Sequence, residues 1–332
     1  MRRDTWIDGV KIFACILVAV GHFIQSMVTA SIYPQNAFFD LFNQSIYSFH
    51  VPLFFICSGY LYQKGTAITS CGRWFRHIAK KLLILGVPYF IFSIITWLTK
   101  YLFTGDVNTQ VAGLFESLFI HPLSPYWYLF ALFLFFLAIP PCKKKSLLPV
   151  YLLIALSLKV ISCFIPISTY LLSVFCSYCI WFVFGMTLKH FNVYQYFEHR
   201  TALFAGSISL VVFLSYTLFH RTVWHETESF LLGFVACFAF ISLAGYTLRT
   251  KTIPWITRLS QYTLPVFLMH TLFAAPVRII LLKFSVTSIP VHTIMGLIAS
   301  FAGPVIATII LNTNKYTAWI LKPQRLLPNP RR

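Results

Sequence analysis

The sequence predicts an all-α, polytopic integral membrane helical bundle of about ten transmembrane helices, and three observations lead to this fold class. Hydrophobic residues make up 58% of the 332 residues and charged residues only 10%, against roughly 45–50% and about 25% in soluble proteins. Apolar runs long enough to cross a bilayer recur along the chain. Basic residues are also concentrated in alternate connections between these runs, as the positive-inside rule requires.

Ten apolar runs are predicted to span the membrane. They are residues 6–29, 45–62, 80–103, 126–141, 147–164, 169–188, 201–219, 229–248, 261–283 and 291–312. The first run follows Met-Arg-Arg as a signal peptide would, but it is too long for one, so we expect it to stay in the mature protein. The apolar stretch 111–120 predicts a short helix at the membrane interface.

Both termini are predicted to be cytoplasmic. With the N-terminus inside, the inner segments hold 20 of the 26 lysines and arginines, whereas the outer loops 30–44 and 104–125 hold none. This alternation accounts for the net charge of +18 without a nucleic-acid partner. We therefore expect a multi-pass protein of the cell membrane, with one membrane domain over 1–312 and a basic, disordered cytoplasmic tail over 313–332.

Span 6–29 carries three polar side chains that should lie on one face. Lys11 and His22 are eleven residues apart, which is close to three helical turns, with Lys11 about 16.5 Å nearer the cytoplasm. Asp8 falls near the same face. Asp8 and Lys11 could simply pair at the start of the helix, and His22 could simply make an interhelical hydrogen bond. We favour a functional role for His22, because a neutral imidazole can take a proton as a general base.

Two further groups of side chains in span 45–62 are candidates. His50 enters from the outer side, where it could hold a hydroxylated ligand together with His22, or it could be only a polar residue at a helix start. Ser58 and Gly59 lie near the inner end, where a small residue lets a ligand or another helix come close. Packing alone would explain them equally well.

The remaining candidates are basic or aromatic. Arg73, Arg76 and Lys80 share one helical face, which suits phosphate binding, although the positive-inside rule also predicts a basic segment here. Trp127 stands at the outer interface, where aromatic residues collect with or without a function. His270 lies in the middle of its span as a packing or site residue.

The eight cysteines suggest neither a zinc site nor a disulfide framework, and we expect no metal.

Several of these segments together resemble a known family. Ile7-Asp8 with Lys11, then Gly21-His22, is followed by the stretch FHVPLFFI and by Ser58-Gly59-Tyr60-Leu61. The later stretches YWYLFALFLF and LSQYTLPVFLMH follow in the family's order. The chain is similar to the integral membrane acyltransferase-3 family, and most similar to its fucose 4-O-acetylase-like branch of surface-glycan O-acetyltransferases.

The resemblance implies a reaction and roles for the candidate residues. An acyl group, usually acetyl, would pass from cytoplasmic acetyl-CoA to a hydroxyl of an extracytoplasmic sugar, with His22 as the catalytic histidine and no permanently bound cofactor. Lys11, which stands where many members have arginine, would bind the donor with Arg73, Arg76 and Lys80. The acceptor would contact His50, Trp127 and His270, whereas Asp8, Ser58 and Gly59 would orient the site. The expected partners are acyl-CoA, a glycan or lipid-linked sugar and membrane lipid, and the expected source is a bacterium.

Two other functions stay open. Buried histidine and lysine in ten spans would also suit a transporter or flippase of a glycan or lipid precursor. A third hypothesis is a structural subunit of an export complex. Acetyl-CoA turnover separates the enzyme from both.

Direct transfer and transfer through an acetyl-histidine intermediate are both compatible with the residues.

Overall fold

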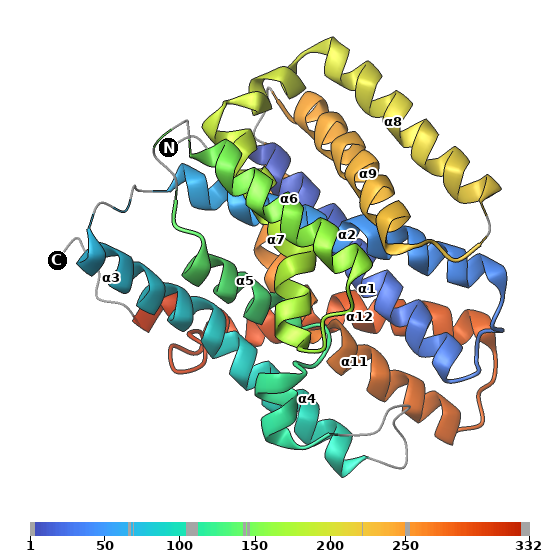
Figure 1. Ribbon diagram of the computed structural model, residues 1–332. Coiled ribbons are helices and arrows are strands. Elements are labelled where there is room, and N and C mark those ends of the chain that lie inside the picture. Colours follow the sequence, from blue (N-terminus) through green and yellow to red (C-terminus); the bar gives the residue numbers. More distant parts are fainter. Residues whose placement is uncertain are drawn as a thin grey trace. The chain divides into compact units, whose positions relative to one another are not determined.

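The computed structural model describes residues 4–65, 68, 70–103, 112–141, 144, 147–220, 222–249 and 253–326, and this part of the chain is all helical with no strand (Figure 1). The longer helices are α1 (Thr5–Thr29), α2 (Ala37–Lys64), α3 (Cys71–Lys81), α4 (Val87–Leu102), α5 (Trp127–Ala138), α6 (Leu148–Phe164), α7 (Tyr170–His190), α8 (Arg200–Phe219), α9 (Glu226–Thr247), α11 (Thr263–Lys283) and α12 (Ile289–Thr313). Short helical segments are η1 (Leu82–Gly86), η2 (Glu116–Ile120), η3 (Val193–Glu198), α10 (Pro254–Leu259), η4 (Ser260–Tyr262) and η5 (Pro323–Leu326).

Each of the ten predicted spans coincides with a helix, and the fold class is confirmed as all-α and polytopic. Seven helical stretches of the described chain are long and apolar enough to cross a membrane. Helices α5 and α6 are shorter than the roughly 20 residues that a full crossing needs. The count of ten crossings and the cytoplasmic position of both termini remain predictions.

Three boundaries differ from the prediction. Helix α2 begins at Ala37, well before residue 45, because the Asn36 side chain caps it by accepting a hydrogen bond from the Phe39 amide over 3.0 Å. A short helix is present in the expected stretch as η2, where the Tyr89 hydroxyl donates to the Leu118 carbonyl, and its position at the membrane interface remains a prediction. Val111, at the start of the predicted stretch, lies outside the described residues.

The expectation of a disordered tail is wrong for residues 314–326. Ala318 and Leu321 are only 1% and 6% exposed, and the Thr317 hydroxyl donates to the Leu311 carbonyl over 2.8 Å. The apolar run Trp319-Ile320-Leu321 explains the difference, since burying it stabilises the segment despite its basic flanks. Arg331 and Arg332 lie outside the described residues.

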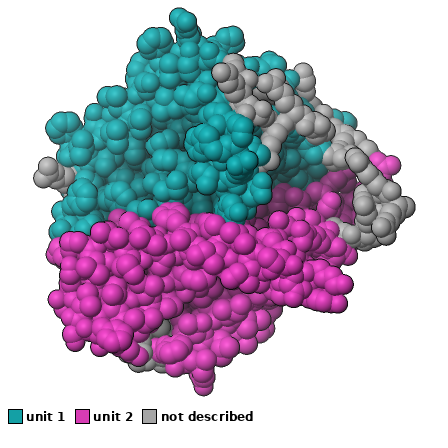
Figure 2. All heavy atoms as spheres, turned by 180° about the vertical axis from the view of Figure 1, so that it is seen from behind, with its two compact units in different colours: residues 1–21, 35–67, 140–263 teal, residues 22–34, 68–139, 264–332 magenta. Residues whose placement is uncertain are grey.

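The chain divides into two compact units, which Figure 2 colours teal and magenta. The first comprises residues 1–21, 35–67 and 140–263, and the second comprises residues 22–34, 68–139 and 264–332. Helix α1 therefore contributes to both, with Lys11 in the first unit and His22 in the second. Each unit is described by itself below.

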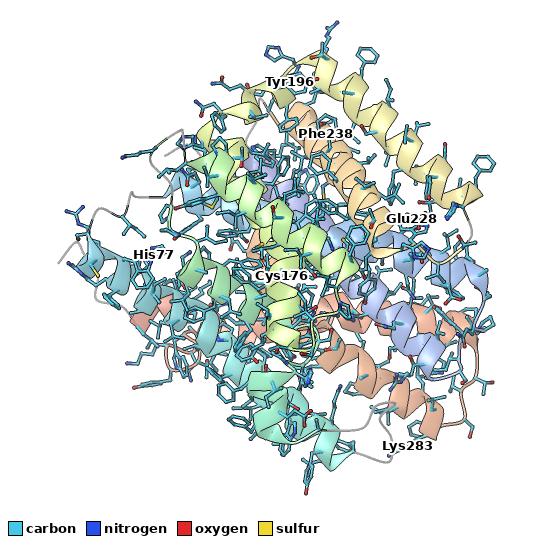
Figure 3. The ribbon with its side chains drawn as sticks, viewed as in Figure 1. His77, Cys176, Tyr196, Glu228, Phe238 and Lys283 are labelled. Atoms are coloured by element: carbon cyan, nitrogen blue, oxygen red, sulfur yellow. The ribbon has the colours of Figure 1, made fainter. Side chains whose placement is uncertain are left out.

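The first unit is built on a close approach of α2 and α7. A Cβ atom added at Gly59 would overlap the Phe182 carbonyl, and one added at Gly185 would overlap the Ile56 carbonyl. The two glycines thus let the backbones touch, as small residues do between membrane helices. Helix α9 joins α8 through Glu228, labelled in Figure 3, whose carboxylate accepts from the Tyr216 hydroxyl and the His225 amide, both over 2.8 Å.

In the second unit, Tyr126 ties α4 to α11. Its side chain is fully buried, and its hydroxyl lies 2.7 Å from the Thr96 hydroxyl and 3.0 Å from the Leu268 carbonyl. The carbonyl can only accept, so the Tyr126 hydroxyl donates to it and accepts from Thr96. This pair of bonds fixes the spacing of two helices whose next turns line the unit's pocket.

Candidate functional site

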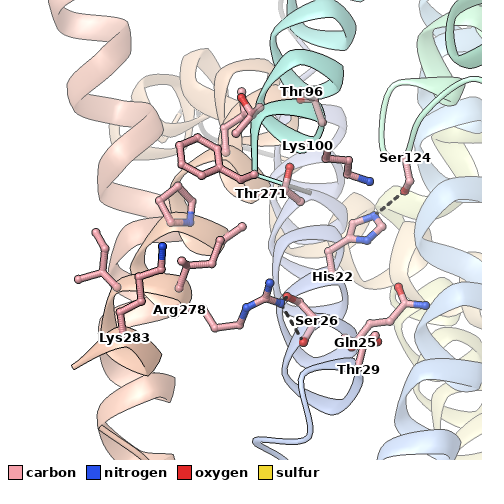
Figure 4. Close-up of a pocket in the computed structure, with 17 residues that line it drawn as sticks. His22, Gln25, Ser26, Thr29, Thr96, Lys100, Ser124, Thr271, Arg278 and Lys283 are labelled. Carbon is pink, nitrogen blue, oxygen red and sulfur yellow. Dashed lines mark hydrogen bonds between the residues drawn. The ribbon is translucent and has the colours of Figure 1, made fainter. Parts of the chain in front are cut away.

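The second unit contains a pocket of about 600 Å³ between the C-terminal part of α1, the end of α4, the segment before α5 and the C-terminal half of α11 (Figure 4). Its wall combines hydroxyl, amide and imidazole groups with three cations. The polar lining residues are His22, Gln25, Ser26, Thr29, Thr96, Thr99, Lys100, Ser124, Thr271, Arg278 and Lys283. Among the described lining residues there is no acid, so the described part of the wall carries positive charge only.

His22 lies in this pocket because α1 continues unbroken from Thr5 to Thr29. Its Nε2 atom is 3.4 Å from the Ser124 hydroxyl, and the two side chains point toward each other in Figure 4. Its ring is half-buried and therefore reachable from the pocket. A histidine in such a place can exchange a proton with a bound hydroxyl.

His270 lies beside His22, with the two ring centroids 5.4 Å apart. Its side chain is 1% exposed, and its Nδ1 atom is 2.9 Å from the Val266 carbonyl. A carbonyl only accepts, so Nδ1 carries the proton and Nε2 keeps its lone pair. Nε2 has no hydrogen-bond partner in the described chain. The structure thus brings His270 to His22, behind the pocket wall rather than on it.

Arg278 is a pocket residue that the sequence reasoning missed. It is 7% exposed, and its Nη1 atom donates to the hydroxyl and the carbonyl of Ser26, the latter over 3.2 Å (Figure 4). Within the part of the chain that the structure describes, its Nε atom has no hydrogen-bond partner. The rule that an ionisable residue inside a span is a functional candidate would have found it. Lys100, Lys283 and Ser124 were missed because only the fold brings their distant segments together.

Five predicted residues lie in the first unit, on α1 and α2. Asp8 and Lys11 are both half-buried on α1. His50 is 1% exposed, its Nδ1 atom contacts the Ile46 carbonyl, and its ring stands edge-on to Tyr47. The closest neighbour of Gly59 is a helix backbone, while Ser58 beside it is half-buried. The predicted cooperation of His50 with His22 stays a prediction.

Three of the four predicted donor-binding residues lie on α3 in the second unit. Arg73, Arg76 and Lys80 are exposed, and no residue of α3 is buried. The segment is helical, as their shared face requires, and the Ser70 side chain caps it by accepting from the Arg73 amide. These residues do not line the His22 pocket. Trp127, at the start of α5, is half-buried and does not line it either.

The first unit has a smaller pocket of about 240 Å³, which the sequence reasoning did not foresee. Tyr47, Trp181 and Phe230 line it with Lys159, which is 6% exposed. The Lys159 ammonium is 3.6 Å from a carboxylate oxygen of Glu226. This ion pair joins α6 to α9 and compensates the buried charge.

Comparison with known proteins decides the family. The model of an acyltransferase domain, that of the acyltransferase-3 family, matches residues 4–312. The chain belongs to this family. The match covers both units, the His22 pocket and α3, and it confirms the resemblance of the sequence motifs.

Two similar proteins are both named nodulation protein NolL. The one from Sinorhizobium fredii (strain NBRC 101917 / NGR234) is 26% identical over 193 residues, which cover 57% of this chain and 50% of that protein. The one from Mesorhizobium japonicum (strain LMG 29417 / CECT 9101 / MAFF 303099) is 26% identical over 192 residues, covering 56% and 49%. The matches thus span about half the length of these curated relatives. No solved structure matches.

Proposed function

We propose that this protein is a membrane O-acyltransferase that moves an acetyl or other short acyl group from cytoplasmic acyl-CoA to a hydroxyl of an extracytoplasmic sugar. The observation that carries the proposal is the position of His22 in the wall of a roomy, polar pocket of an acyltransferase-family chain. The pocket is large enough for a monosaccharide unit together with a thioester group.

In the proposed reaction His22 is the general base. The Ser124 hydroxyl, 3.4 Å from His22 Nε2, marks a place where a sugar hydroxyl could stand in hydrogen-bond reach of the ring. His22 takes the hydroxyl proton while the oxygen attacks the thioester carbonyl carbon. The carbon–sulfur bond then breaks, and the imidazolium returns the proton to the departing CoA thiolate. Transfer through an acetyl-histidine intermediate would use the same groups.

Other pocket groups can stabilise the charge that develops during attack. The Thr271 hydroxyl and the Lys100 ammonium line the same wall as His22. Donors aimed at the developing oxyanion are the largest catalytic term in many acyl transfers. His270 supports the site by packing against the His22 ring, which restricts how that ring can turn.

The donor would arrive from the face that carries Arg73, Arg76 and Lys80. Three exposed cations on one side of α3 suit the phosphates of a nucleotide. Lys11 and His22 lie on one face of the continuous helix α1, about 16.5 Å apart along its axis. A pantetheine arm is an extended chain that suits such a path.

Turnover by the purified protein tests the proposal. Protein reconstituted in lipid nanodiscs receives acetyl-CoA with or without a mixture of p-nitrophenyl glycosides, and both CoA thiol release and sugar esters are measured. We expect acceptor-dependent thiol release matched one-to-one by O-acetyl sugar. Glycan movement across liposomes without any thiol release would instead identify a transporter and contradict the proposal.

A further inference from the structure

We propose that the His22 pocket selects an acidic acceptor, that is, a sugar bearing a carboxylate or phosphate group, and that Arg278 binds this oxyanion. The inference rests on the proposed acyl transfer and adds the chemical class of the acceptor to it. Three features of the second unit support it: an incompletely paired buried guanidinium, the absence of acids among the described residues of the pocket wall, and the positions of the other two cations.

The first feature is the state of the Arg278 guanidinium. A guanidinium has five N–H donors in a fixed plane, and carboxylates and phosphates match this plane with two parallel hydrogen bonds. Arg278 is 7% exposed and uses Nη1 on Ser26. Its buried Nε atom has no hydrogen-bond partner among the described residues. The side chain is therefore held in place by Ser26 while donor capacity is left over.

The second feature is the charge balance around Arg278. Among the described residues, no aspartate or glutamate lines the pocket. The described part of this unit has a single acid, Glu116, which is exposed on η2 and does not line the pocket. Burying a guanidinium without an anion is costly, and a bound oxyanion would offset that cost.

The third feature is the placement of Lys100 and Lys283. Both line the pocket with Arg278, and Figure 4 draws Lys100 near His22 and Lys283 near the Arg278 end. Three cations that face one cavity raise the local concentration of an anionic ligand. The pocket also has His22 in its wall, so an acceptor anchored by its acidic group would present its hydroxyls to the base.

Predicted topology favours the acceptor over the phosphates of CoA as the source of the oxyanion. The pocket is formed by the C-terminal ends of α1, α4 and α11. All three ends are predicted to be extracytoplasmic, whereas the exposed cations of α3 are predicted to be cytoplasmic. Since the CoA phosphates are expected to bind on the cytoplasmic side, a cation on the outer side would not contact them.

A pair of matched acceptors tests the inference. p-Nitrophenyl β-D-glucuronide and its methyl ester have the same ring hydroxyls and differ only in the charge of one group. We expect wild-type kcat/KM to be about 10- to 100-fold higher for the acid, the size of one charge-assisted hydrogen-bond pair. In Arg278→Gln this ratio should fall to near one, and Arg278→Lys should recover part of it. The KM for acetyl-CoA should not change.

Three controls keep the result interpretable. Calorimetry of both glycosides with purified protein measures the same preference without turnover. Lys283→Gln, at an exposed position of the same wall, should lower the ratio even if Arg278 variants do not fold. Lys315→Gln, an exposed lysine of the same unit outside the pocket, should leave it unchanged.

Two outcomes would overturn the inference. One is a wild-type protein that binds and uses the acid and its ester equally. The other is an Arg278→Gln variant that keeps the preference but has a raised KM for acetyl-CoA, because the oxyanion would then be a CoA phosphate. Failure of acyl transfer itself would look different, since no glycoside would give thiol release although binding could still discriminate the pair.

Discussion

A histidine that acts as a general base must present a ring nitrogen to its substrate, and His22 is the histidine among the described lining residues of the pocket. Its surroundings are built from three distant parts of the chain. Ser124 approaches Nε2, and the His270 ring lies behind at 5.4 Å. Two histidines that seemed unrelated in sequence therefore belong to one cluster, in which one ring faces the pocket and the other is buried.

Replacing His22 with glutamine should remove most turnover. Glutamine keeps a hydrogen-bonding side chain of similar size but cannot act as a base, so kcat should fall about 10²- to 10⁴-fold. Acetyl-CoA binding, measured by calorimetry, should persist. The matched control is His292→Gln, which alters a histidine that is 1% exposed in the same unit and outside the pocket. Near-normal kcat in purified, monodisperse His22→Gln protein would reduce His22 to a packing residue.

The basic face of α3 gives a second prediction at the residue scale. Arg73→Ala and Arg76→Ala should each raise the KM for acetyl-CoA roughly ten-fold if each loses a charge-assisted bond worth about 1.5 kcal/mol. The acceptor KM should change little. Arg258→Ala, at another exposed basic position predicted to be cytoplasmic, is the control. An unchanged donor KM in the double variant would leave α3 with a topological role only.

The predictability of the site differed from residue to residue. His22 and His270 were found because an ionisable group deep in an apolar run is conspicuous. Lys100 and Lys283 resemble the snorkelling lysines found near many helix ends, and Ser124 has no distinguishing pattern. Their roles depend on which helix ends meet, and a single sequence contains little information about long-range contacts between apolar helices.

At the scale of elements, apolar run length predicted the helices of the ten spans, whereas α3 lies almost wholly outside those runs. An apolar run of about 20 residues can satisfy all its backbone hydrogen bonds within itself by forming a helix, which the bilayer core requires. Helix ends were less predictable, because they depend on caps such as Asn36 and on tertiary burial such as that of Ala318. The close approach of α2 and α7 could be suspected from Gly59 but needed Gly185 from a distant helix.

The α2–α7 contact yields a stability prediction. Alanine is a better helix former than glycine, so any destabilisation by Gly59→Ala or Gly185→Ala must come from the overlap of the new Cβ with the facing carbonyl. We expect each change to cost about 1–3 kcal/mol and to lower the Tm of purified protein. Gly72→Ala, where no atom lies within 4 Å of the new Cβ, should not lower it. Equal Tm values for all three would contradict this packing.

At the scale of the whole molecule, the proposed acyl transfer requires donor and acceptor to reach His22 from opposite faces of the membrane. The net charge of +18 is distributed so that the predicted inner segments are basic, while the His22 pocket is assigned by the same topology to the outer side. This arrangement would let an acyl group from cytoplasmic acetyl-CoA be attached to a glycan on the other side of the membrane.

Acyl transfer measured in vesicles of each orientation tests whether donor and acceptor meet from opposite faces of the membrane. Inverted membrane vesicles, loaded with p-nitrophenyl glycosides in the lumen, receive acetyl-CoA outside, and luminal O-acetyl sugar is measured by mass spectrometry. We predict product in inverted vesicles, none in sealed right-side-out vesicles given external acetyl-CoA, and at least 10²-fold less with His22→Gln. Equal product in both orientations, or product that does not depend on His22, would contradict transfer through the membrane at this site.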